Sequence, residues 1–270
     1  FWIPPGELDR QFTEKPAYLP AAAVFQPNPL SPPVNMLPAL KNGHITFGSF
    51  NRHNKINDSV IVLWSMLLRN VSNAQLVLGA ISPEYQKGLI QSFEHEGIGR
   101  DRLTFFDRAT QTDYLALHHQ VDFCLDTFPH GGGATTAHAA WMGVPTLSLA
   151  GESPASRFGA TEMHHLGLDE FIASSIEDFI NKGCYWAEHI SELAAIRHGM
   201  RVRFNNSALG QPEIFASNFD VLLRTMWQRW CNDLPPAPLA IDAPIQISPA
   251  SVSSVQTTAQ ELEMLESLYH

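Results

Sequence analysis

Short apolar segments alternate with amphipathic segments through the middle of this 270-residue chain, and this alternation limits the fold more than any other feature. The amphipathic segments carry apolar residues at helical spacing, as at Ile61, Trp64, Leu67, Leu68 and Val71. Apolar strands that are separated by helices predict a parallel sheet with helices on both faces. Strands are expected at residues 44–49, 75–79, 102–106, 121–126 and 144–149, and helices near 57–71, 84–95, 112–119 and 135–142.

Proline residues mark the boundaries that we expect for the folded part. Nine of the 19 prolines lie in residues 1–40 and five lie beyond residue 230, and proline disfavours both helix interiors and sheet ladders. We therefore predict a proline-rich segment over 1–40, an α/β, Rossmann-like domain with a helical C-terminal extension over 41–231, and a proline-rich linker over 232–258. Residues 259–270 have a helical pattern and are expected to begin a helix that is cut short.

The charge balance and the cysteines argue against several classes of protein. There are 17 Lys and Arg against 27 Asp and Glu, a net charge of −10, which disfavours a nucleic-acid partner or an anionic membrane surface. No run of about 18 apolar residues occurs, and the chain starts without a Met or a signal-peptide pattern. Three cysteines without a CxxC pair indicate reduced thiols, so we expect a cytoplasmic protein.

Two segments, residues 47–55 and 126–136, lie where strands are expected to end. In open parallel sheets, ligands bind at these carboxyl ends. The second segment holds three consecutive glycines, whose N–H groups can approach an anion closely, and we expect Gly132 to adopt a positive φ. Two threonines then stand at the start of a helix, where phosphate is favoured, and Lys55 in the first segment supplies a positive charge. The pattern predicts a site for a nucleotide diphosphate.

Other interpretations of these residues stay open at this point. A glycine triplet before a helix is commonly only a turn, a lone lysine is commonly a solvated charge, and neither GxxxxGK[ST] nor GxGxxG follows the first strand. The 12 histidines show no HExxH or metal-ligand spacing, so no metal site is expected. Loop histidines are candidate bases but more often surface residues, namely His53, His130 and His138. Packing is expected for His118, His119, His164 and His165. The tryptophans are expected to be core or interface anchors, namely Trp141, Trp186, Trp227 and Trp230.

The motifs around these segments resemble, in the same order, those of the SPINDLY-type and O-linked N-acetylglucosamine transferase family. The matching stretches cover about residues 36–230 and are Ile45–Asn51 with Lys55 and Ile56, Asp122–Pro129, Gly132–Gly133 with Thr135–Thr136, Ala140–Pro145, Leu149–Gly151, Ala155–Arg157 and Met226–Trp227. The resemblance implies a GT-B glycosyltransferase, and this chain looks like its carboxyl-terminal, donor-binding half.

The resemblance also implies roles for single residues. Lys55 stands where the family has a lysine that contacts the donor diphosphate and helps the leaving group, so it is the implied catalytic residue. Thr135 lies in the family's phosphate-cradling segment, and Arg52 lies where relatives often have a Gln or Asn that also reaches the phosphates. The implied nucleotide-binding residues are Arg52, Gln111, Tyr114, His130, Gly131, Gly132, Gly133, Ala134, Thr135 and His138.

Several positions depart from the family pattern. Ala134 lacks the hydroxyl of a family threonine, and His138 replaces an aspartate that holds the ribose. Gln111, Tyr114 and Leu117 stand where the animal enzymes use Lys, His and Arg near the nucleobase. The resemblance therefore leaves the base of the donor open.

The activity that the resemblance implies is transfer of N-acetylglucosamine from UDP-GlcNAc to Ser or Thr of proteins, with no metal or other cofactor. The implied partners are the nucleotide sugar, an acceptor protein, and the family's N-terminal catalytic half with its tetratricopeptide repeats, which we expect to be missing here. One alternative is a different donor, such as GDP-fucose, or glucosylation of asparagine. Another is a nucleotide-sugar-binding or scaffold module without activity.

Overall fold

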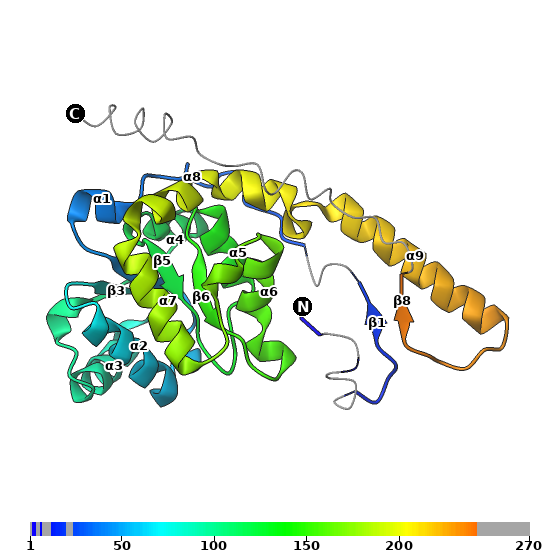
Figure 1. The fold of residues 1–270 in the computed structure, drawn as a ribbon, viewed down its shortest axis with the longest axis horizontal. Coiled ribbons are helices and arrows are strands. Elements are labelled where there is room, and N and C mark those ends of the chain that lie inside the picture. The colour runs from blue at the N-terminus through cyan, green and yellow to red at the C-terminus, as the bar shows by residue number, and fades with distance from the viewer. Residues whose placement is uncertain (1, 4–5, 7–11, 20–23, 242–270) are drawn as a thin grey trace.

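The centre of the molecule is a parallel sheet with helices on both sides (Figure 1). This computed structural model describes residues 2–3, 6, 12–19 and 24–241. In the described part the strand order is β4-β3-β2-β5-β6-β7, and neighbouring strands are parallel. The strands are β2 (Thr46–Ser49), β3 (Gln75–Leu78), β4 (Leu103–Phe105), β5 (Phe123–Leu125), β6 (Thr146–Leu149) and β7 (Ile172–Ala173).

The helices alternate with these strands, which confirms the α/β class predicted from the sequence. They are α1 (Pro38–Asn42), α2 (Asp58–Asn70), α3 (Pro83–His95), α4 (Gln111–Leu117), α5 (Ala134–Trp141), α6 (Phe158–His165), α7 (Ile176–Glu188), α8 (Ile190–Asn206) and α9 (Pro212–Cys231). Asn57 caps α2, since its side chain accepts a hydrogen bond from the Val60 N–H. The sequence did not predict β7 and α6, because β7 has two residues and α6 has a weak apolar pattern.

The strand order reverses between β2 and β5. The chain adds β3 and β4 on one side of β2 and then returns to place β5 on the other side. Phe47 pairs with Phe123, so the segments that follow these two strands leave the same edge of the sheet side by side. Ligands of open parallel sheets bind at such a switch point. The topology thus brings together the two segments that the sequence singled out.

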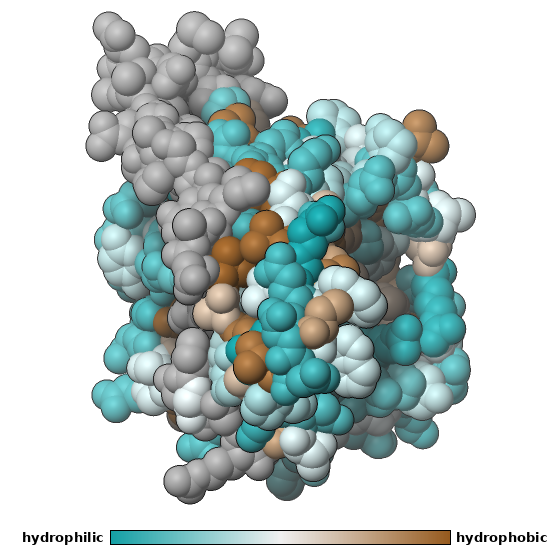
Figure 2. Space-filling view, turned by 90° about the vertical axis from the view of Figure 1, so that its right-hand side faces the viewer, coloured by the Kyte–Doolittle hydropathy of each residue, from teal (hydrophilic) through white to brown (hydrophobic). Residues whose placement is uncertain are grey.

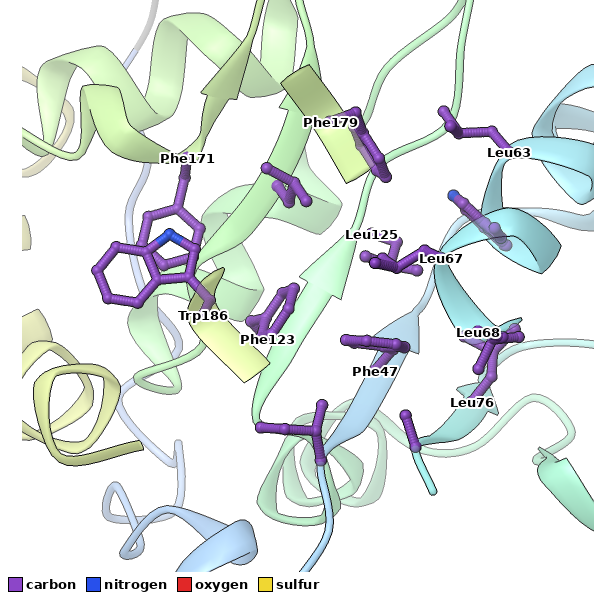
Figure 3. Packing of buried hydrophobic residues seen from close by; sticks show 14 of the residues in the cluster. Phe47, Leu63, Leu67, Leu68, Leu76, Phe123, Leu125, Phe171, Phe179 and Trp186 are labelled. Carbon is purple, nitrogen blue, oxygen red and sulfur yellow. The ribbon is translucent and has the colours of Figure 1, made fainter. Parts of the chain in front are cut away.

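The main core lies between the sheet and α2, α3 and α7 (Figure 3). Phe171 stacks on Trp186 with ring centroids 4.6 Å apart, which places this tryptophan in the core as expected. α7 approaches α2 closely because Gly183 has no side chain, and a Cβ there would lie 2.6 Å from Leu67. The apolar stripe predicted for α2 is buried, apart from a half-buried Val71. These contacts hold the sheet that positions the candidate site.

A buried arginine ties the segment before α1 to the domain. The Arg197 side chain is 1% exposed, and its guanidinium donates to the carbonyls of Asn35 (2.9 Å), Val121 (2.8 Å) and His118 (3.2 Å). Farther upstream, the Phe25 N–H donates to the Leu209 carbonyl at 2.9 Å. Residues 24–35 of the proline-rich segment are therefore packed on the domain.

Helix α9 projects away from the domain (Figure 1). Of its side chains only Asn218 and Leu222 are buried, whereas Trp227 and Trp230 are 66% and 75% exposed and do not anchor the core. Beyond α9, β8 (Leu239–Ala240) pairs in parallel with β1 (Ala17–Tyr18). The rest of the predicted linker and the helix predicted at 259–270 lie outside the described residues.

We expect Arg197→Ala to lower the free energy of unfolding by about 3–5 kcal/mol, because it leaves buried carbonyls of three segments without a donor. Urea denaturation followed by circular dichroism measures this change. Arg224→Ala is the matched control: Arg224 pairs with Asp220 at 2.8 Å on the exposed surface of α9, so its loss should leave the unfolding free energy nearly unchanged. Equal effects of the two substitutions would contradict the assignment of Arg197 as the clamp.

Candidate nucleotide-binding site

A cavity of about 590 Å³ lies at the switch point. Its walls come from the segment that follows β2 and the segment that follows β5, as the sequence predicted. The lining residues are Asn51, Arg52, Asn54, Lys55, Asn57, Phe128, Pro129, His130, Gly133, Ala134 and Thr135. Arg52, Lys55, His130, Gly133, Ala134 and Thr135 were identified from the sequence, whereas the asparagines and the Phe128–Pro129 wall were not.

The buried carboxylate of Asp126 holds the glycine loop in place. It accepts hydrogen bonds from the Gly132 N–H (2.7 Å), the Thr127 N–H (2.9 Å) and the Ser148 hydroxyl (2.8 Å). Burial raises the pKa of Asp126, while these donors and the positive charge of Lys55 oppose the rise. The loop is therefore held by hydrogen bonds to a buried side chain beneath it.

Gly131 and Gly132 serve close packing. The expectation of a positive φ at Gly132 is wrong, because φ is positive at none of the three glycines. A Cβ on Gly131 would lie 2.9 Å from the Asp126 carboxylate, and one on Gly132 would lie 2.5 Å from the Thr136 hydroxyl. A Cβ on Gly133 would meet no atom within 4 Å. Gly133 therefore borders open space in the cavity, whereas the other two glycines allow the loop to sit on Asp126.

The first turn of α5 faces this cavity through Gly133, Ala134 and Thr135. Gly133 is the N-cap and provides no capping side chain. The N–H groups of a first helical turn have no partner inside the helix, and the helix dipole makes this end positive. The helix start is thus suited to hold a phosphate.

Lys55 reaches across the cavity from the other segment. It is half-buried, and its ammonium donates a hydrogen bond to the Gly131 carbonyl at 2.8 Å. Burial lowers the pKa of Lys55, the neighbouring Asp126 charge raises it, and Arg52 lowers it. The lysine is therefore less solvated than the sequence suggested, and it places a cation beside the glycine loop.

The remaining predicted residues form a second group on α4 and α5. The rings of Tyr114 and His138 are 5.5 Å apart and edge to face, and Phe25 contacts the other side of His138 at 5.0 Å. Burial raises the pKa of Tyr114 and lowers that of His138. Gln111 is exposed at the first position of α4. These three residues do not line the cavity around Lys55.

The histidines sort into buried and accessible positions. His118 stacks on Phe50 at 4.0 Å, and burial lowers its pKa to about 3, so it is a neutral packing residue as expected. His130 is exposed at the rim of the cavity, and His53 stacks on Tyr85 at 3.5 Å. His53 and His130 are thus the histidines near the cavity that solvent reaches.

A second buried carboxyl lies near Asp126 and gave no signal in the sequence. A Cβ on Gly159 of α6 would lie 2.1 Å from the Asp126 carboxylate, and Glu162 follows one turn later. Its Oε2 atom is buried and has no hydrogen-bond partner in the described part of the chain. Burial raises the pKa of Glu162 well above its usual range, and the charge of Asp126 adds to the rise. The surroundings of Glu162 therefore favour the protonated carboxyl over the charged one.

Residues 35–219 of the chain match the family described as Glycosyl transferase family 41. A probable UDP-N-acetylglucosamine–peptide N-acetylglucosaminyltransferase SPINDLY of Eustoma exaltatum is 29% identical over 86% of this chain, and the match covers 26% of that relative. The UDP-N-acetylglucosamine–peptide N-acetylglucosaminyltransferase of Caenorhabditis elegans is 24% identical over 73% of the chain and 17% of its own length. The chain thus spans about a quarter, or less, of the curated relatives described here.

Solved structures share the fold. A mutant of the O-GlcNAc transferase of Thermobaculum terrenum superposes with a TM-score of 0.68 at 28% identity, over 76% of this chain and 40% of that one. TarM superposes with a TM-score of 0.51 at 11% identity, over 74% of this chain and 38% of its own, and shows the fold alone. The switch-point cavity lies within the residues that match the family.

Two further classes of feature are missing from the described residues. No three His, Cys, Asp or Glu side chains in this part of the chain are grouped so that they could hold a metal ion. No helix among residues 24–241 is both long enough and apolar enough to cross a membrane.

We expect Glu162→Gln to remove a loss of stability at rising pH. In the unfolded chain Glu162 loses its proton near its ordinary pKa, whereas the folded protein keeps it to a higher pH, so the free energy of unfolding falls as pH rises above about 4.5. This one group contributes a slope of up to about 1.4 kcal/mol per pH unit. Urea denaturation of both proteins at pH 5, 6, 7 and 8 measures the difference.

The exposed Glu177→Gln substitution in the first turn of α7 provides the control. It should leave the pH dependence of the parent protein unchanged, because Glu177 is solvated. If Glu162→Gln also leaves the profile unchanged, the carboxyl is charged in the folded protein and the assignment is wrong.

Proposed function

This chain belongs to glycosyl transferase family 41, and on that premise we propose that it is the donor-binding half of a protein O-glycosyltransferase. The proposed reaction transfers N-acetylglucosamine from UDP-GlcNAc to Ser or Thr hydroxyls of an acceptor protein. The observation that carries the proposal is the meeting of Lys55, the glycine loop and the uncapped start of α5 around one cavity. A diphosphate is the group of a nucleotide sugar that such a site suits.

In the proposed reaction, the acceptor oxygen attacks the anomeric carbon of the sugar and the bond from that carbon to the diphosphate oxygen breaks. The electron pair stays on the departing UDP, and the hydroxyl proton passes to a base. Lys55 and the N–H groups at the start of α5 are fixed donors for the charge that grows on the diphosphate. Because Asp126 holds the loop beforehand, little reorganisation is needed when the charge develops.

The nucleoside is proposed to extend toward the second group of residues. Tyr114 offers a ring to the base, and Gln111 and His138 offer polar groups to the ribose. These side chains differ from those of the animal enzymes. The identity of the nucleobase, proposed here as uracil, therefore depends on this group of residues.

The acceptor half of the enzyme is the proposed partner of this chain. The exposed apolar residues of α9 support a contact with another protein surface, and they are Phe219, Val221, Leu223, Met226, Trp227 and Trp230. Figure 2 views the molecule from the side on which α9 projects, and hydrophobic atoms are seen there between hydrophilic ones. We also propose that the enzyme acts in the cytoplasm and uses no metal.

The 270-residue chain should bind UDP and UDP-GlcNAc with similar, weak affinity, with Kd of about 0.1–1 mM. The described site contacts the diphosphate on one side, and the sugar's other neighbours are proposed to come from the acceptor half. Isothermal titration with UDP, UDP-GlcNAc and GDP measures this. If GDP binds more tightly than UDP, the donor is a guanosine nucleotide sugar and the proposed uridine donor is wrong. If no nucleotide binds, the proposal of a donor site is contradicted.

Two glycine variants separate binding from folding in this titration. Gly133→Val places a side chain in the open space at the start of α5 and should weaken UDP binding at least tenfold. Gly88→Val on the exposed side of α3 also meets no neighbouring atom within 4 Å and should leave UDP binding unchanged.

Lys55→Ala should lower sugar transfer by about 10²-fold in the enzyme that contains both halves, in the range found when one donor to a developing charge is removed. The thermal midpoint should fall by only a few degrees, since the substitution also removes the hydrogen bond to Gly131. Radiolabelled transfer to acceptor protein measures the rate. Lys87→Ala on exposed α3 controls for the loss of charge, and full activity of Lys55→Ala would remove Lys55 from the mechanism.

A further inference from the structure

A second, larger cavity lies at the opposite edge of the sheet. Its volume is about 740 Å³, within the range of small-molecule sites. Thr46 and Gln75, the first residues of β2 and β3, lie in it, so it sits where these strands begin. The switch-point cavity lies where β2 and β5 end, and the two cavities share no lining residue.

This distal cavity exists because α4 is too short to cover the whole face of the sheet. α4 has seven residues, about 10 Å of helix, and its Tyr114 and Leu117 cover the part of the face near Phe50. Thr46, Gln75, Val77 and Thr104 line the cavity from one face of three adjacent strands; Thr104 is exposed and Gln75 half-buried, whereas Thr46 and Val77 are buried. The exposed polar side chain of this floor is Thr104, since the Gln75 amide donates to the carbonyls of Asp101 and Arg102.

The titratable side chains that line the distal cavity are all basic, although the chain as a whole carries a net charge of −10. They are Lys41 on α1, His44 before β2, and His119 after α4. Lys41 makes no ion pair with any residue that the structure describes. The nearby acid, Asp122, already accepts the N–H groups of Ala39 and Thr46. The rim of the cavity therefore favours an anion.

The hydrogen bonds of the two histidines point to the kind of anion. His44 Nδ1 bonds the Asn42 carbonyl at 3.1 Å and His119 Nε2 bonds the Pro33 carbonyl at 2.8 Å. A carbonyl only accepts, so these nitrogens carry protons and the other nitrogen of each ring is left for a ligand. A phosphate monoester, whose second pKa is about 6, can either donate its own proton to such a nitrogen or accept one from the protonated ring. A carboxylate with a pKa near 4 can only accept at neutral pH.

We propose that the distal cavity binds a small organic phosphate monoester. Its phosphate lies against Lys41, His44 and His119, and its organic body lies against the exposed Leu40 of α1. The site is separate from the proposed donor site, and the proposal does not depend on the proposed function.

The test uses phenyl phosphate as the probe and the amide NMR spectrum of the 270-residue chain as the readout. Phenyl phosphate should shift the amide signals of Lys41, Thr46 and Thr104, and benzyl alcohol, inorganic phosphate and benzoate should each bind at least tenfold more weakly. Lys41 is exposed, so Lys41→Glu should leave the fold intact and weaken phenyl phosphate binding at least tenfold. Lys87→Glu, the same change of charge on the opposite side of the sheet, should have no effect.

Several results would overturn the proposal. These are no shift at the distal cavity, shifts confined to residues 131–136 of the nucleotide site, equal binding by Lys41→Glu and the parent protein, and equal binding of benzyl alcohol or benzoate. Lys55→Ala supplies the last comparison: it should remove any response at residues 131–136 and leave the response of Lys41, Thr46 and Thr104 as it was.

Discussion

The buried carboxylate of Asp126 is the interaction on which the candidate site depends. It draws the Gly132 N–H and the Ser148 hydroxyl toward one point, and so joins the glycine loop to the neighbouring strand β6. Gly159 allows α6 to approach the same carboxylate. A buried charge is costly unless it is paired and hydrogen-bonded, so these donors and Lys55 are needed for the carboxylate to stay in place. Loop, strand and helix are thus arranged around one acidic side chain.

Strand β5 is held by a buried acid at each end, and the two acids have different tasks. Asp122 precedes the strand and accepts the N–H groups of Ala39 and Thr46, which ties α1 and β2 to it. Burial raises its pKa to about 6, and Arg197 opposes the rise. Asp126 follows the strand and shapes the loop that faces the nucleotide cavity. One acid therefore stabilises the frame of the sheet, and the other positions the candidate site.

The sequence predicted the sheet well because its strands are apolar and its helices have regular apolar spacing. It placed Lys55 and the glycine loop at one edge because parallel strands end together. It could not show that the glycines pack against Asp126 and Thr136 without adopting a positive φ, since that depends on contacts between distant segments. Glu162 gave no signal either, because nothing in a short helix with weak apolar spacing marks a buried acid.

The distribution of charge in the switch-point cavity supports the proposal that this chain binds the donor. The lining of the switch-point cavity contains the basic side chains of Lys55 and Arg52, together with the start of α5, and no carboxylate. Lys55, Arg52 and the helix start suit a negatively charged diphosphate, and His130 in the same lining is a side chain that can accept a proton. His130 lies exposed in the lining of the cavity, whereas His53 lies next to the lining residues Arg52 and Asn54 and stacks on Tyr85. In the proposed reaction, a base from the acceptor half would take the proton of the attacking hydroxyl, while Lys55, held beside Asp126, faces the charge on the diphosphate.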